Sequence, residues 1–263
     1  MTDVEEVKRL LDRMNEQQRR TILGYLRSLL PAHRVEERLM ISSEGILDAL
    51  DRAGDFTFRM IRGVFAEAAF ATDVLPTISE HWRLLPIVGD RPFDFWLTDT
   101  PVDVTPAESL PFAAVRLQVK MQRSVGKRPL HANEVWRTRV AWPADHYVVE
   151  LQKSRKGQKR GVSTRPYRFD EFDLVAVSLG PARGRWGAFI YTVARWLLPD
   201  PANPANILLY QPVAPQDNDC WTTDFNRAVE WLRGGLDRRI NGAVPRLVGK
   251  KSARKKRSPK KRK

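Results

Sequence analysis

The stretch RLQVKMQ, residues 116–122, alternates strictly between polar and apolar side chains. A period of two places successive side chains on opposite faces of a strand, so the stretch predicts a half-buried β-strand with Leu117, Val119 and Met121 facing a core. Its other face holds Gln118 and Lys120, two residues apart. That face is either a solvent-exposed sheet surface or one half of a metal site.

A second alternating stretch, FDFWLT at residues 93–98, carries one acidic side chain, Asp94. The apolar residues of the two stretches form one core face when the strands lie side by side, so Asp94, Gln118 and Lys120 share the opposite face. Facing Cβ atoms on neighbouring strands lie about 4.5–5.5 Å apart. The sequence therefore predicts that these three polar side chains meet on one side of a sheet.

The rest of the chain mixes helical and strand patterns, which predicts an α/β (α+β) fold with a mixed β-sheet flanked by helices. Helices are expected within residues 3–53, at about 56–71, and after the cap candidates Thr222, Thr223 and Asp224. Strands are expected at about 82–88, 92–99, 112–122, 145–152, 173–179, 187–194 and 206–211, with loops at 89–92, 180–187 and 199–206. We divide the chain into an N-terminal helical region (1–54), a core (55–240) and a basic tail (241–263).

Composition bounds the class of protein. A chain of 263 residues with 42% hydrophobic residues can bury a core of its own. It has no run of about 18 apolar residues and its N-terminus is charged, which argues against a membrane span and against export. Cys220 is the single cysteine, which excludes an internal disulfide and zinc sites built on several cysteines. We therefore expect a protein of the reducing cytoplasm.

The net charge of +14 is concentrated at the C-terminus. Residues 250–263, KKSARKKRSPKKRK, contain ten Lys or Arg and no acid, whereas the rest of the chain has 35 basic and 31 acidic residues, or +4. Such a segment cannot form a core, which predicts a disordered tail. Dense positive charge binds phosphates with little sequence demand, so we expect nucleic-acid affinity and association with the nucleoid. A solubilising or localisation tail is the alternative.

The predicted polar cluster contains the parts of a magnesium site. Mg²⁺ prefers oxygen ligands at about 2.0–2.1 Å, and the Asp94 carboxylate, the Gln118 amide and the Val119 backbone carbonyl offer three. Lys120 then reaches a phosphate or an attacking water. A cation, a bound water and a neighbouring ammonium group are what metal-assisted phosphodiester hydrolysis requires.

Glu67 lies in the predicted helix just upstream, within GVFAEAAFA at residues 63–71. Gly63 and Ala71 flank it at four-residue spacing, so its helix face is small and open. A carboxylate among such apolar neighbours must find a partner or water. Glu67 either joins the cluster or points to solvent.

These residues resemble the PD-(D/E)xK nuclease superfamily, because Pro92 and Asp94 are followed by Gln118-x-Lys120 and preceded by a helix that carries an acid. Glutamine at the second acidic position is similar to a variant of methyl-directed (Mrr-like) and other bacterial restriction endonucleases. Longer stretches within about residues 55–238 also resemble a bacterial group of predicted restriction endonucleases. These stretches are GDRPFDFWLTD, VRLQVKMQRS, TRPYRFDEFDLVAVSL, YTVARWLLPDPANP and WTTDFNRAVEWLRGGL.

The resemblance implies that residues 55–240 form a restriction-endonuclease-like catalytic core. It implies that Asp94 binds Mg²⁺, that Gln118 supplies an amide oxygen, and that Lys120 assists the attacking water. Glu67 would hold a second ion or orient water. Gln118 departs from the common pattern, since a neutral ligand leaves less negative charge for the metal.

A basic loop, KSRKGQKRGVSTRP at residues 153–166, predicts phosphate contacts because no acid interrupts it. Its basic residues are Lys153, Arg155, Lys156, Lys159, Arg160 and Arg165. Gln122 and Arg123 continue the strand of Lys120 and would line the same groove. A solvated loop is the alternative.

The sequence thus predicts a Mg²⁺-dependent endonuclease that hydrolyses phosphodiester bonds in double-stranded DNA, in restriction or another form of defence. The alternatives are a repair or junction-resolving nuclease, a catalytically inactive DNA-binding protein in which Gln118 is the lesion, and a basic structural protein of the nucleoid or ribosome. Cutting both strands usually takes two active sites, so we expect a homodimer. A companion DNA methyltransferase encoded nearby would favour restriction over repair.

Overall fold

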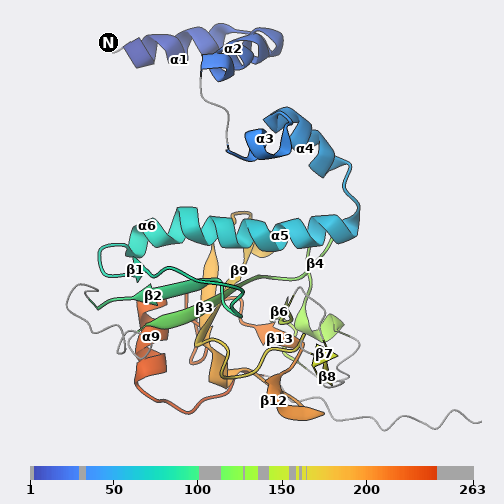
Figure 1. Ribbon diagram of the computed structural model, residues 1–263, viewed down its shortest axis with the longest axis vertical. Helices are drawn as coiled ribbons and strands as arrows, with labels where there is room; N and C mark the ends of the chain where they lie inside the picture. The colour runs from blue at the N-terminus through green and yellow to red at the C-terminus, as the bar shows by residue number, and fades with distance from the viewer. Residues whose placement is uncertain are drawn as a thin grey trace, which may run out of the picture. The chain divides into compact units, whose positions relative to one another are not determined.

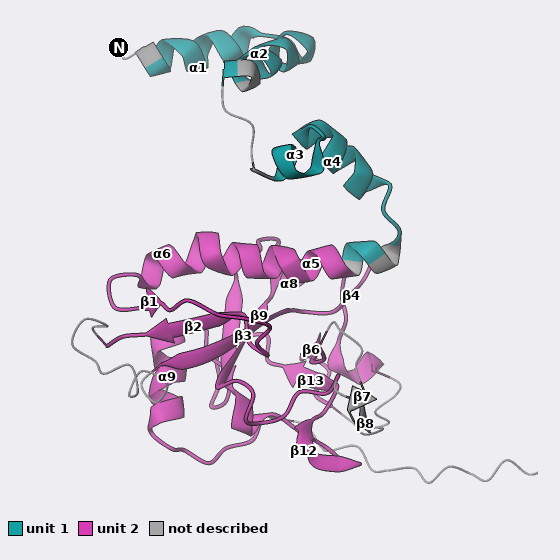
Figure 2. Cartoon of the chain, in the orientation of Figure 1, with its two compact units in different colours: residues 1–58 teal, residues 59–263 magenta. Residues whose placement is uncertain are grey.

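The computed structural model describes residues 3–29, 34–100, 114–126, 128–135, 142–153, 158–159, 162–163 and 165–241. The chain divides into two compact units, Met1–Phe58 and Arg59–Lys263, which Figure 2 shows in different colours. The first unit contains the helices α1 (Asp3–Arg13), α2 (Glu16–Leu29), α3 (Arg34–Leu39) and α4 (Ser43–Asp51). From residue 242 onward, the predicted basic tail lies outside the described residues.

The second unit contains the main sheet, whose strand order is β1-β2-β3-β9-β10 within the described residues. These strands are β1 (Arg83–Leu84), β2 (Phe95–Thr98), β3 (Val115–Met121), β9 (Leu174–Ser178) and β10 (Phe189–Val193). Strands β3 and β9 are parallel and the other neighbours are antiparallel, so the sheet is mixed (Figure 1). The predicted mixed α/β fold is confirmed.

Further strands pair in twos. The pairs are β13 (Tyr210–Val213) with β6 (Tyr147–Glu150), β11 (Pro199–Asp200) with β12 (Asn203–Ile207), β4 (Ser124–Val125) with β5 (Arg128–Pro129), and β7 (Gln158–Lys159) with β8 (Val162–Ser163). The loop predicted at 199–206 is therefore the β11–β12 hairpin. The single strand predicted at 206–211 is wrong, because the chain changes partners there: the Leu208 N–H donates to Leu198, whereas Tyr210 pairs with Glu150.

Helices cover one face of the main sheet. The helix predicted at 56–71 is α5 (Asp55–Ala69), which continues through a π-helical turn, η1 (Phe70–Val74), into α6 (Leu75–Ile78). The buried Phe70 ring packs on Phe95 and Phe189, with centroid distances of 4.8 and 5.5 Å. Among the described helices, none has the length and apolar character that crossing a membrane requires.

The last helix, α9 (Phe225–Arg233), packs on the same face, since the Phe225 ring lies 5.6 Å from that of Tyr191 on β10. It begins where the cap pattern predicts, because the Asp224 side chain accepts hydrogen bonds from the N–H groups of Asn226 and Arg227. The remaining short elements are α8 (Gly180–Arg183) and the 3₁₀ turns η2 (Ala132–Glu134) and η3 (Ala194–Trp196).

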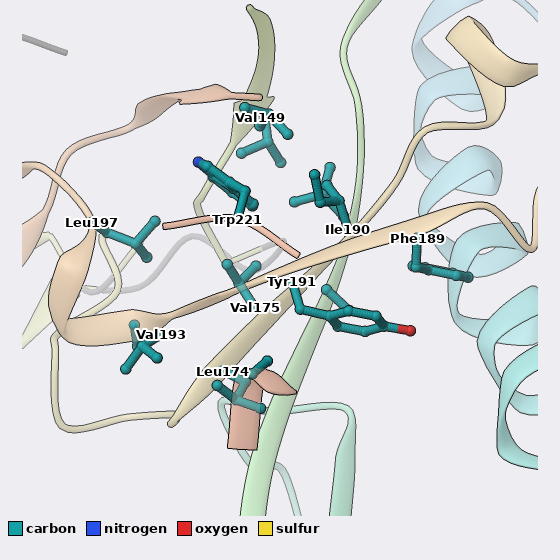
Figure 3. Packing of buried hydrophobic residues seen from close by; sticks show 14 of the residues in the cluster. Val149, Leu174, Val175, Phe189, Ile190, Tyr191, Val193, Leu197 and Trp221 are labelled. Atoms are coloured by element: carbon teal, nitrogen blue, oxygen red, sulfur yellow. The ribbon is translucent and has the colours of Figure 1, made fainter. Parts of the chain in front are cut away.

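The opposite face of the main sheet is buried as well. Gln118 pairs across the strands with Val175, and these side chains are 1% and 0% exposed. Figure 3 shows Trp221 and Val149 gathered on the Val175 side of the sheet, away from Leu174. The predicted strand is present, and of the two alternatives for its polar face, a solvent-exposed surface does not fit Gln118, which is buried. Strand β3 is interior and parallel to β9, and parallel strands are commonly covered on both faces.

Candidate active site

The site begins where two strands of the main sheet meet. Asp94 immediately precedes β2, and its backbone N–H donates to the Leu117 carbonyl at 2.9 Å. Because Phe95 pairs with Leu117, this bond carries the pairing one residue further and places Asp94 beside Gln118. The Asp94 carboxylate and the Gln118 amide therefore meet on one face of the sheet, as the alternation of the two stretches predicts.

Hydrogen bonds connect Asp94, Gln118 and Val119. The Asp94 Oδ2 atom accepts the Val119 backbone N–H at 2.7 Å and also accepts a bond from the Gln118 Nε2 atom. The same Nε2 atom donates to the Val119 carbonyl oxygen at 3.1 Å. Two oxygen acceptors thus converge on one donor in a buried position, where electrostatic interactions are strong.

Lys120 and Glu67 place two further charges beside this group. The pKa of Glu67 is raised from 4.5 to about 7, mainly by burial and also by the Asp94 carboxylate, while Lys120 opposes the change. The pKa of Asp94 is also raised by burial, against Lys120 and the hydrogen bonds from Val119 and Gln118. Burial lowers the pKa of Lys120, which both carboxylates oppose. Glu67 on α5 therefore joins the cluster electrostatically.

The oxygen atoms of Asp94, Gln118 and Val119 are of the kind that Mg²⁺ prefers as ligands. The amide of Gln118 carries its oxygen opposite its nitrogen, so a half-turn of the amide points Oε1 to where Nε2 now meets Asp94 and Val119. The oxygens of Asp94, Gln118 and Val119 would then neighbour one another, and the Glu67 carboxylate interacts electrostatically with Asp94. Among the described residues, no three His, Cys, Asp or Glu side chains form a metal-binding group. A cation here would therefore rely on amide and backbone oxygens as well as carboxylates.

Tyr167 is a member of the site that the sequence pattern does not identify. The Nζ atoms of Lys120 and Lys153 lie 5.4 and 5.5 Å from the centre of its buried ring. Burial raises the pKa of Tyr167, and the negative charges of Asp94, Glu171 and Glu67 raise it further. A lone tyrosine in a loop has no periodicity or spacing that links it to β3. Only the fold reveals its position.

The residues predicted to bind DNA are placed differently from one another. Lys153 forms an ion pair with Glu171 at 2.5 Å and reaches the site through the Tyr167 ring. Arg123 pairs with Glu150 at 2.8 Å. Gln122 is fully buried, and its amide has no hydrogen-bond partner in the described part of the chain. Neither Gln122, which is buried, nor Arg123, which is paired with Glu150, lines an open groove.

The structure places few side chains of the rest of the basic loop. Arg165 Nε donates to the Lys153 carbonyl at 3.4 Å. The backbone of Lys159 forms part of β7, but the Lys159 side chain lies outside what the structure describes. Arg155, Lys156 and Arg160 lie outside the described residues altogether. Phosphate binding by these residues stays a prediction.

Comparisons with known proteins add no relative. Neither a protein-family model, nor a curated protein, nor a solved structure matches the chain.

Proposed function

We propose that the chain is a Mg²⁺-dependent endonuclease that hydrolyses phosphodiester bonds in double-stranded DNA. The observation that carries this proposal is the convergence of Asp94 Oδ2 and the Val119 carbonyl on the Gln118 amide nitrogen, with Lys120 and Glu67 in electrostatic contact. Two half-buried carboxylates with raised pKa values favour a cation beside them, because it lowers the cost of ionising both.

Bound Mg²⁺ would polarise the scissile phosphate and lower the pKa of a water molecule. Asp94, the rotated Gln118 amide and the Val119 carbonyl would hold this ion, while Glu67 would accept hydrogen bonds from its water ligands. In this role the Gln118 amide must turn by half a revolution, which exchanges a donor for an acceptor without moving the backbone. A Mg²⁺ ion often keeps several water ligands, so few protein ligands suffice.

Lys120 would supply positive charge where the phosphate becomes more negative. Its ammonium group is partly buried beside the Tyr167 ring, which restricts its position. Hydrogen-bond donors held in place within a site of low dielectric stabilise a developing charge better than solvent does. Lys153, over the same ring, would contact a neighbouring phosphate and contribute to DNA affinity rather than to the chemical step.

A catalytically inactive DNA-binding protein is the second candidate, and the hydrogen bonds of Gln118 favour it. The Gln118 amide donates to both Asp94 and Val119, so it satisfies without metal the acceptors that a cation would need. A neutral side chain also attracts a cation less than an acid does. In this reading the basic loop and tail provide affinity, and the former catalytic cluster only stabilises the fold.

Cleavage of duplex DNA, measured with Mg²⁺ and with a chelator, separates the two candidates. The full chain should cut a mixture of unmodified and methylated plasmids only with Mg²⁺. Replacing Lys120 by Ala should reduce the rate roughly a hundred- to a thousandfold, the usual loss for one preorganised group. Lys153→Ala is the matched control, because Lys153 lies over the same ring but pairs with Glu171.

The control variant should weaken DNA binding and keep most of the maximal rate. Equal losses of rate in Lys120→Ala and Lys153→Ala would remove the special role of Lys120. No metal-dependent cleavage by the unchanged chain, together with cleavage by Gln118→Glu, would support the inactive DNA-binding protein. A role in restriction rather than in repair or junction resolution would be supported by a companion methyltransferase gene.

A further inference from the structure

The first two helices of the chain, α1 and α2 (blue in Figure 1), keep apolar side chains at their surface. Within the described residues, valine and leucine side chains on both helices are between 47% and 62% exposed, namely Val4, Val7 and Leu10 on α1 and Leu23, Leu26 and Leu29 on α2. Exposed apolar patches commonly mark sites of protein–protein interaction. The two helices are therefore a candidate interaction surface.

The junction between α1 and α2 is fixed by hydrogen bonds. The Asn15 side chain accepts the Gln18 N–H at 2.9 Å, and the Gln18 side chain accepts the Asn15 N–H at 3.0 Å, which is a reciprocal cap at the start of α2. Arg19 donates to the carbonyl oxygens of Leu11 and Asp12 at 2.9 and 3.1 Å, at the end of α1. The apolar side chains thus stay exposed although the two helices are held in a defined arrangement.

The apolar positions of α1 suit pairing with a second copy of the same helix. Val4, Val7, Leu11 and Met14 are three or four residues apart, the spacing of the seam between paired helices. These positions are symmetric about Arg9. In an antiparallel pair of α1 helices, Val4 of one copy therefore lies opposite Met14 of the other, and Val7 lies opposite Leu11. A two-fold interface requires a surface that is complementary to itself in this way.

The charges beside this seam are complementary to themselves as well. Glu6 and Arg13 are seven residues apart, about two helical turns, so they lie on the same flank of α1. Both are exposed, and neither forms an ion pair within the described part of the chain. In the antiparallel pair, Glu6 of each copy faces Arg13 of the other. Opposite charges placed across an interface favour one partner and fix the register.

The size of the surface also suits a stable dimer. Interfaces of standard size take about 20–30 residues from each partner. The helices α1 and α2 have 11 and 14 residues. Two such helix pairs make a four-helix bundle, whose core takes apolar side chains from all four helices.

We infer that α1 and α2 are the interface of a homodimer, in which the α1 helices of two copies pair antiparallel within a four-helix bundle. This inference goes beyond the proposed nuclease activity and does not rest on it. The dimer carries two copies of the Asp94–Lys120 cluster, the number that cutting both strands of a duplex usually takes.

Sedimentation equilibrium of the full chain, free of DNA and over a range of concentrations, measures the association. The unchanged chain should form a dimer. Val7→Asp places a charge in the apolar seam twice per dimer, so it should raise the dissociation constant about a hundredfold or more. Val88→Asp is the matched control, because Val88 is 77% exposed in the loop between β1 and β2 and should leave the constant unchanged.

Reversal of charge tests whether the partner is a second copy. Glu6→Arg and Arg13→Glu each set like charges opposite one another, so each variant alone should dimerise about tenfold more weakly or worse. In an equal mixture of the two variants, both positions again face the opposite charge. The mixture should therefore form a heterodimer about as tightly as the unchanged chain dimerises.

A dimer that Val7→Asp weakens, and that the mixture of charge variants restores, supports the inference. An unchanged chain that is monomeric at every concentration would overturn it, because the helices would then dock on the rest of their own chain. A dimer that Val7→Asp does not weaken would place the interface elsewhere, and a mixture that does not recover would exclude the antiparallel pairing. Because the measurement contains neither DNA nor Mg²⁺, its outcome is independent of the nuclease proposal.

Discussion

Replacing Gln118 by Glu tests whether this side chain occupies a cation position. In the structure the Gln118 amide donates to Asp94 Oδ2 and to the Val119 carbonyl. A glutamate removes both donors and puts a second carboxyl group beside Asp94, in a position that is 1% exposed for Gln118. Two adjacent buried carboxylates cannot both ionise readily, so one would remain protonated at neutral pH.

The cost follows from these contacts. Leaving a buried acceptor without its donor costs about 1–3 kcal/mol. Asp94 Oδ2 keeps the hydrogen bond from the Val119 N–H, however. A proton shared between the Asp94 carboxyl group and the introduced carboxyl group would restore one of the lost bonds. We therefore expect Gln118→Glu to lower the free energy of unfolding by about 2–4 kcal/mol without metal. For a unit of this size each kcal/mol shifts Tm by about 2–4 °C, so Tm should fall by roughly 4–16 °C.

Magnesium should reverse this loss. In the proposed site both carboxylates would become ligands of the ion, and a ligand at about 100 times its Kd stabilises the folded state by about 2.7 kcal/mol. Thermal unfolding with Mg²⁺ and with a chelator measures the difference. Tm of Gln118→Glu should rise with Mg²⁺ by more than Tm of the unchanged chain, whose glutamine is a weaker ligand.

Gln211→Glu is the matched control for this experiment. Gln211 is fully buried and is bonded to the backbone of Leu198 and Leu208, so its replacement also removes buried hydrogen bonds. It has no proposed cation, and its Tm should not respond to Mg²⁺. If Gln118→Glu responds to Mg²⁺ no more than Gln211→Glu does, the assignment of Gln118 to a metal site is refuted.

Two further predictions concern pH and salt. Because the fold raises the pKa of Glu67 from 4.5 to about 7, the stability that this residue contributes is complete below about pH 4.5 and is lost as pH rises through about 7. Denaturant unfolding of Glu67→Gln without metal should show a flatter stability curve across this window, and an unchanged curve would contradict the raised pKa. Truncation after Val248 should weaken DNA binding and reduce the slope of log K against log salt by roughly 0.9 per lost phosphate contact. An unchanged slope would assign the tail to localisation.

Much of the secondary structure follows from local pattern. The alternation at 116–122 predicts β3 because a period of two is a property of neighbouring residues in the chain. The strands predicted at 173–179 and 187–194 are present as β9 and β10 for the same reason. The start of α9 follows from the cap residue Asp224, whose hydrogen bonds are local. The limits of β2 do not follow from the local pattern, since the strand begins at Phe95 rather than at residue 92.

By itself, the sequence determined the mixed fold, the polar positions on β3 and the placement of Asp94 beside Gln118, because strand period and pairing on a common face are short-range rules. Only the tertiary structure decided that Gln118 on the polar face of β3 is buried, that it presents its nitrogen to Asp94, and that Tyr167 lies beneath Lys120 and Lys153. These features depend on contacts between segments far apart in the chain, on the parallel pairing of β3 with β9 and on the competition of several acceptors for one amide. No local pattern encodes such contacts.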